Sequence, residues 1–264
     1  MAPTLTSILT LRVNTGFGGL ADTRPRDVLE LQRVLTRELS YGVLSASEGD
    51  PRPPGQVNVR SVQEQDDPAE SHHLPRSWVR AVILLRINSL IKGYSGVRLA
   101  ILSCLQALLT HDTIPMVSLR GSISASGDLS PLTYISSAIQ GKPTIRIFCP
   151  VKDVYADEAL AQVNLQPASL TAKEGPAIVN GTAVSTACGA LVLHDTHQLV
   201  VLSQILTAMT VEALLGTPAS FDALFSQVRP QPGQIETATN IRAFLRGSQL
   251  AVAKHGKNGA LRQD

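Results

Sequence analysis

Residues 121–135 read GSISASGDLSPLTYI, a run of small residues that passes into an apolar segment. The first half is rich in glycine and serine, which predicts a loop and not a helix. The second half is apolar, and Asp128 is well placed to N-cap a helix that starts there. Taken alone, the tripeptide Ala125, Ser126 and Gly127 predicts only an ordinary turn.

The composition around this stretch favours a mainly helical protein. Of the 264 residues, 44% are apolar and only 4% are aromatic, and leucine, isoleucine, valine and alanine supply most of the apolar share. That balance favours packed helices over a β-sandwich. The formal net charge of +2 comes without a run of lysine or arginine, which argues against a nucleic-acid partner.

Apolar spacing predicts helices on both sides of the glycine-rich loop. The predicted helical segments cover about 26–44, 76–111 with a bend at 93–96, 156–162, 181–215 and 235–253, and residues 144–148 are β-prone. The stretch 45–75 is polar and rich in proline, which predicts a long surface insertion. Between these elements we find no internal repeat.

Three features bear on location and cofactors. The apolar run 199–215 is interrupted by polar residues, so we expect a buried helix and no membrane partner. The first residues form a poor signal peptide, and three scattered cysteines form no disulfide framework, which points to the cytoplasm. His194 and His197 are spaced as a metal pair would be, but no third ligand accompanies them, so we expect no metal.

Four further segments carry motifs in a fixed order along the chain. They are 14–18 (NTGFG), 84–98 (LLRINSLIKGYSGVR), 173–185 (KEGPAIVNGTAVS) and 232–236 (PGQIE). Together with 121–135 they resemble the aromatic amino acid ammonia-lyase family, with the greatest likeness to fungal phenylalanine ammonia-lyases. The resemblance implies the mainly α, helical ammonia-lyase fold with its fumarase/aspartase-like bundle. It also implies that this chain is the N-terminal portion of a longer protein.

The resemblance assigns a catalytic group to the loop. In the family, an Ala-Ser-Gly triad cyclises and loses water to form 4-methylideneimidazol-5-one, an electrophile, so Ala125, Ser126 and Gly127 would be its precursors. Asn180 would hydrogen-bond the oxygen of this group. Gln263 matches the first residue of the family's Gln-Asp-Arg-Tyr motif, which belongs to the active site.

The resemblance also implies the substrate, a small aromatic amino acid. Phe17 would line the pocket, and Glu38 and Leu39 fall on the family's selectivity pair. The implied reaction turns L-phenylalanine into trans-cinnamate and ammonia. Because a carboxylate beside a bare phenyl ring is costly, Glu38 leaves tyrosine or histidine open as substrates. The family's tyrosine base aligns with Leu11, which leaves an inactive fragment or pseudoenzyme as the alternative.

The implied organisation has two parts. Residues 1–181, including the insertion 45–75, would form the domain that carries the electrophile. Residues 182–264 would start the central helical bundle. By the same resemblance we expect a homotetramer, since active sites of the family combine residues from several chains.

Overall fold

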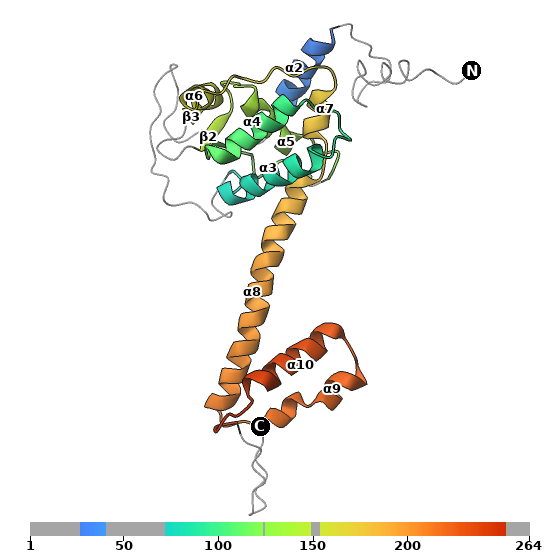
Figure 1. Ribbon diagram of the computed structural model, residues 1–264, viewed down its shortest axis with the longest axis vertical. Helices are drawn as coiled ribbons and strands as arrows, with labels where there is room; N and C mark the ends of the chain where they lie inside the picture. The colour runs from blue at the N-terminus through green and yellow to red at the C-terminus, as the bar shows by residue number, and fades with distance from the viewer. Residues whose placement is uncertain (1–26, 41–71, 124, 149–153, 252–264) are drawn as a thin grey trace, which may run out of the picture. The chain divides into compact units, whose positions relative to one another are not determined.

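The computed structural model describes residues 27–40, 72–123, 125–148 and 154–251 (Figure 1). The chain divides into two compact units, Met1–Ala190 and Leu191–Asp264. The two domains predicted from the sequence, with their boundary at residue 181, stay a prediction about the whole protein.

The first unit is helical with one small sheet. Its elements are α2 (Val28–Glu38), α3 (Arg76–Leu90), α4 (Leu99–Thr110), β1 (Ile114–Pro115), α5 (Ser130–Ile139), β2 (Arg146–Phe148), β3 (Val154–Tyr155), α6 (Ala156–Gln162), α7 (Glu174–Val179) and the start of α8 (Ala183–Ala213). The strands form one antiparallel sheet in the order β1-β2-β3. The bend predicted at 93–96 separates α3 from α4, and both of its glycines have positive φ. The mainly α prediction is therefore confirmed.

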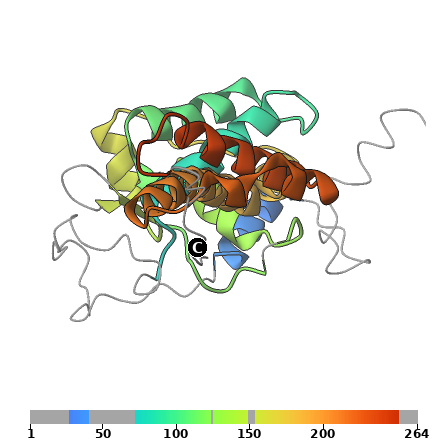
Figure 2. The ribbon, with the colours of Figure 1, turned by 90° about the horizontal axis from the view of Figure 1, so that it is seen from below.

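The helix α5 lies at the centre of this unit. Every residue from Pro131 to Ile139 is buried. Around α5 pack the helices α2, α4, α6 and α7 and the strand β1 (Figures 1 and 2). Because Leu132, Ile135 and Ile139 are each only 1% exposed, burial of each side chain contributes roughly 1.5–3 kcal/mol to the free energy of folding. The segment that follows the candidate triad is therefore anchored in the core.

The end of the predicted polar insertion belongs to the same core. Residues 45–71 lie outside the described residues. Beyond them the Leu74 amide donates to the Val117 carbonyl oxygen at 2.8 Å, and Leu74 is buried. The rings of His73 and Phe148 meet edge to face with centroids 4.9 Å apart. The prediction of a surface insertion over 45–75 is therefore wrong for residues 72–75, because backbone hydrogen bonds and an aromatic contact attach them to the core.

The second unit is built on the rest of α8. It adds the 3-10 helix η1 (Pro218–Phe221), α9 (Ala223–Val228) and α10 (Pro232–Phe244). Its core consists of Ala208, Ile241, Leu245 and Ala251, with Val211 and Phe221 packed against them. At the edge of this core the Asn240 side-chain amide donates to Oε1 of Gln204 at 2.9 Å.

The helix α8 is exposed over most of its apolar surface. Leu199 is 64% exposed, and Leu206 and Met209 are 50% and 57% exposed. The prediction that 199–215 forms a buried helix is therefore wrong for this chain. The reason is geometric. A helix that is apolar on all sides needs neighbours on all sides to be buried, and the small core of this unit contacts α8 on one side only.

The same region stands out by hydropathy. Among the described residues, the helical stretch Glu174–Ala213 is the one with the length and apolar composition of a membrane-crossing helix, with a mean hydropathy of 1.5 over an 18-residue window. Core helices of globular proteins share this length and composition.

Candidate functional site

The candidate triad forms a tight turn. The amide of Asp128 donates to the carbonyl oxygen of Ala125 at 3.0 Å, which closes the turn around Ser126 and Gly127. All three triad residues are exposed. The turn therefore orients the Ala125 carbonyl toward a hydrogen-bond donor and leaves the triad open on the surface of the chain.

The Asp128 carboxylate closes the loop that carries this turn. It accepts hydrogen bonds from the Ser122 hydroxyl and from the Ile123 amide, the latter at 2.7 Å. The capping residue of α5 is Leu129, and the helix amide that the Asp128 carboxylate accepts is that of Ser130, at 3.3 Å. The expectation that Asp128 is the N-cap is wrong by one position. Its carboxylate instead ties the two ends of the loop together.

Two glycines flank this loop in different ways. Gly121 has a φ of +97°, a conformation that side chains disfavour, so glycine is needed where the chain enters the loop. At Gly127 an added Cβ would meet no atom within 4 Å. In this conformation of the turn, a side chain at Gly127 would therefore meet no steric obstacle.

Asn180 directly follows the short helix α7. Its backbone is extended, and its amide donates to the Pro176 carbonyl oxygen at 3.0 Å. The residue is exposed, whereas the preceding Ile178 and Val179 are fully buried. The buried pair anchors the end of α7, and the exposed Asn180 directly follows that anchored end.

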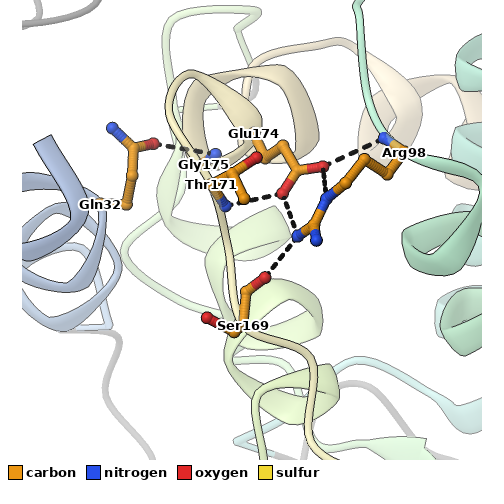
Figure 3. A network of polar contacts seen from close by, with 6 residues as sticks. All are labelled: Gln32, Arg98, Ser169, Thr171, Glu174 and Gly175. Carbon is orange, nitrogen blue, oxygen red and sulfur yellow. Dashed lines mark hydrogen bonds and ion pairs between the residues drawn. The ribbon is translucent and has the colours of Figure 1, made fainter.

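The start of α7 is held by a network of polar contacts (Figure 3). The Glu174 carboxylate accepts the amide and Nε of Arg98, at 3.0 and 2.9 Å, on one oxygen. Its other oxygen accepts Arg98 Nη2 at 2.8 Å and the Thr171 amide at 2.7 Å. Beside it, the Gly175 amide donates to Oε1 of Gln32 at 3.0 Å, which joins α7 to α2.

This network sets the charge of Glu174. The side chain is only 1% exposed, and burial by itself raises the pKa of a carboxyl group. The hydrogen bonds from Arg98 and Thr171 outweigh burial and lower the pKa of Glu174 from 4.5 to about 2. Glu174 is therefore an anion at neutral pH and belongs to the support of α7.

The other predicted site residues divide into two groups. Glu38 is the last residue of α2 and Leu39 is its half-buried C-cap, whereas Phe17 and Gln263, like Leu11, lie outside the described residues. The triad precedes α5, Asn180 follows α7 and the selectivity pair ends α2, and these three helices contact one another. The predicted site residues within the described range thus belong to one cluster of helices.

The described residues offer no competing metal or thiol site. No group of three or more histidine, cysteine, aspartate or glutamate side chains is arranged to hold a metal ion within the described ranges. Cys104 and Cys188 are half-buried, and burial raises the pKa of both thiols. Protonated thiols are poor nucleophiles, so neither cysteine is set up as a nucleophile at neutral pH.

Comparison with known proteins decides the family. The sequence pattern of the family described as aromatic amino acid lyase matches residues 11–264. The chain belongs to the aromatic amino acid lyase family. It is 45% identical over 263 residues to the phenylalanine/tyrosine ammonia-lyase of Rhodotorula toruloides, covering 96% of this chain and 35% of the relative. It is 41% identical over 239 residues to a phenylalanine aminomutase of Talaromyces islandicus, covering 90% of this chain and 32% of the relative.

Solved structures agree with this lyase assignment. The crystal structure of phenylalanine ammonia-lyase from yeast Rhododporidium toruloides has a TM-score of 0.77 and 43% sequence identity, and the match covers 90% of this chain and 35% of that one. A tyrosine aminomutase from Streptomyces globisporus has a TM-score of 0.76 at 29% identity, covering 94% and 42%. The predicted lyase fold and the resemblance to fungal phenylalanine ammonia-lyases are confirmed. The chain spans about a third of the curated relatives it matches.

Sequence reasoning missed the residues that support the site. Glu174 and Arg98 lie inside the two segments that carried the family resemblance, as does Arg86. A glutamate and an arginine in separate family motifs were the available signal for an ion pair. The sequence held no sign of which residues would meet, because the partners are 76 positions apart.

Proposed function

We propose that this lyase removes ammonia from L-phenylalanine without oxidation and releases trans-cinnamate. The observation that carries the proposal is the turn at Ala125–Asp128, in which the carbonyl to be attacked already accepts a hydrogen bond from a backbone amide. The similarity to relatives named phenylalanine ammonia-lyase supports the choice of substrate.

The proposed maturation uses only the residues of the turn. The amide nitrogen of Gly127 attacks the carbonyl carbon of Ala125 and closes a five-membered ring, and the carbonyl oxygen leaves as water. The Ser126 hydroxyl then leaves as a second water together with the α-hydrogen, which yields 4-methylideneimidazol-5-one. The Asp128 amide stabilises the negative charge that develops on the Ala125 oxygen during the attack.

The described residues fit this group. The triad is exposed, and no atom lies within 4 Å of the position that a Cβ of Gly127 would take. The group supplies an electrophilic methylidene carbon for the amine of the substrate. In the proposed arrangement Asn180 donates a hydrogen bond to the ring oxygen from the end of α7. Gln263, outside the described residues, joins the same site in this proposal.

Tyrosine is the second candidate substrate, with histidine as a further alternative. A carboxylate at Glu38 at the end of α2 is better matched to a phenol than to a bare ring, and one relative is named for both phenylalanine and tyrosine. The ratio of kcat/KM values for phenylalanine, tyrosine and histidine tests the point in the wild type and in Glu38→Phe. Unchanged ratios would show that Glu38 has no part in the choice.

We propose a homotetramer as the working assembly. The exposed apolar side chains of α8 support this proposal, because large exposed apolar surfaces mark interaction sites. Light scattering over a concentration series measures the assembly directly. A chain that remains a monomer at micromolar concentration would contradict the proposal for this polypeptide.

Mass spectrometry of the folded chain tests the proposed maturation. The peptide that contains the triad should be lighter than its sequence by two waters. Ser126→Ala lacks the hydroxyl that leaves and should lose no second water, whereas Ser103→Ala on α4 serves as a control and should keep the full loss. A folded wild-type chain with an unmodified triad would favour the alternative, a non-catalytic fragment or pseudoenzyme. The leucine at position 11, where the family has its tyrosine base, favours the same alternative.

A further inference from the structure

Arg86 of α3 is a buried arginine whose guanidinium faces the end of α7. Its side-chain Nε donates to the Ile178 carbonyl oxygen at 2.8 Å. Its Nη2 donates to the Asn180 carbonyl oxygen at 2.9 Å and also to that of Ala177. The last carbonyls of a helix have no partner within the helix, so one side chain satisfies three groups that burial would otherwise leave unpaired.

Arg86 is committed to this contact. It is 5% exposed, and among the described residues no carboxylate forms an ion pair with it. Burial lowers the pKa of Arg86, but arginine stays charged at neutral pH. A cation at the C-terminal end of a helix is favourable because the exposed carbonyls carry partial negative charge. The charge of Arg86 is thus balanced by the backbone that leads into Asn180.

The residue after Asn180 is shaped by the same guanidinium. A Cβ added at Gly181 would lie 2.5 Å from Nη1 of Arg86, closer than any stable contact. The backbone at residue 181 therefore passes close to the guanidinium, and a side chain at this position would displace it. Two independent observations, the three hydrogen bonds and the close passage at Gly181, place the Asn180 backbone against Arg86.

We propose that Arg86 is a positioning residue that fixes the backbone of Asn180 and thereby aims its side chain. The inference rests on the proposed function, in which Asn180 hydrogen-bonds the electrophile. Arg86 touches neither the triad nor the substrate in this arrangement and acts only through Asn180. The opposite end of α7 is held by Arg98 through Glu174, which provides a matched arginine at the other end of the same helix.

The first test measures the backbone without reference to activity. In Arg86→Lys a single ammonium replaces the fork of donors, so amide exchange at residues 178–182 should rise about tenfold or more. In Arg98→Lys the rise should fall on residues 171–175, with 178–182 changed by less than about twofold. Equal exchange at 178–182 in both variants would overturn the inference. If Arg86→Lys does not fold, Gly181→Ala displaces the same guanidinium and should give the same local increase.

The second test uses activity of the lyase in the complete protein. Arg86→Lys should lower kcat about tenfold or more with little change in KM, because binding of the substrate is left intact. In an Asn180→Ala background the same substitution should have no further effect on kcat. Effects on kcat that multiply in the double variant would overturn the inference. If the wild type shows no lyase activity, the proposed function fails, and the exchange experiment still decides whether Arg86 fixes Asn180.

Discussion

The two units of this chain differ in how completely they bury their apolar side chains. In the first unit, α5 is buried from Pro131 to Ile139 and is surrounded by other helices. In the second unit, α8 leaves Leu199, Leu206 and Met209 at least half exposed, over a core of a few residues. The candidate site residues that the structure describes all lie in the first unit. The local geometry of these residues is thus set by contacts within the first unit, whereas the apolar side chains of α8 are left exposed.

The largest expected difference is in amide hydrogen exchange. Amides in α5 should exchange about a thousandfold or more slowly than those in α10, since opening α5 exposes a core and opening α10 exposes little. Hydrogen-exchange mass spectrometry of the intact chain at low concentration measures both helices at once. Equal protection would mean that the second unit is as complete as the first.

A matched pair of leucines tests the same contrast in stability. Leu132→Ala in α5 should lower the free energy of unfolding by about 2–5 kcal/mol, because it leaves a cavity in a closed core. Leu206→Ala in α8, which is already half exposed, should change it by less than about 0.5 kcal/mol. Urea denaturation of each variant gives these values. A large cost at Leu206 that depends on protein concentration would show that association covers α8.

The Glu174 network should make the stability of the first unit depend on pH. Its pKa lies at about 2 in the fold and near 4.5 when unfolded. The stabilisation is therefore complete above about pH 5 and is lost as the pH falls from about 4.5 towards 2. Glu174→Gln should cost on the order of 2–3 kcal/mol at pH 7 and progressively less below pH 4.5.

The control for this experiment lies in the second unit. Glu236→Gln changes an exposed glutamate of α10 and should alter the free energy of unfolding by less than about 0.5 kcal/mol. Denaturation curves of both variants between pH 3 and pH 7 provide the comparison. A constant difference between wild type and Glu174→Gln over that range would refute the ionic role of Glu174.

The smallest effects should have opposite signs at two glycines of the first unit, one buried in α7 and one exposed on α8. At Gly175 an added Cβ would lie 2.6 Å from Oε1 of Gln32, so Gly175→Ala should disturb that hydrogen bond and cost about 1 kcal/mol. At Gly189 in α8 a Cβ would meet nothing within 4 Å, and Gly189→Ala should stabilise the helix by about 0.5–1 kcal/mol. Thermal unfolding of the two variants shows the signs. If Gly189→Ala lowers the stability instead, another part of the protein packs closely against α8 at this position.

Sequence periodicity and motif order anticipated much of the first unit. The helices α3, α4 and α6, the bend at 93–96 and the strand β2 within the β-prone 144–148 appear where local preferences place them. The helix α7 was not predicted. The helices predicted for 26–44 and 235–253 end earlier, at Glu38 and Phe244. The loop around the triad was also foreseen, since glycine and serine disfavour a helix. The N-cap was misplaced by one residue. One oxygen of the Asp128 carboxylate accepts hydrogen bonds from Ser122 and Ile123, and the other accepts the Ser130 amide at 3.3 Å.

By itself, the sequence determined the family and the helical class and indicated the candidate triad, because motifs and short-range preferences are properties of the chain read in order. The tertiary structure alone decided that Arg86 meets the end of α7 and that Glu174 meets Arg98. These partners lie 94 and 76 positions apart at most, so folding had to bring them together before any contact existed. The tertiary structure also decided that α8 is exposed. Burial of an apolar helix depends on which other elements pack against it, and the composition of the helix does not specify them.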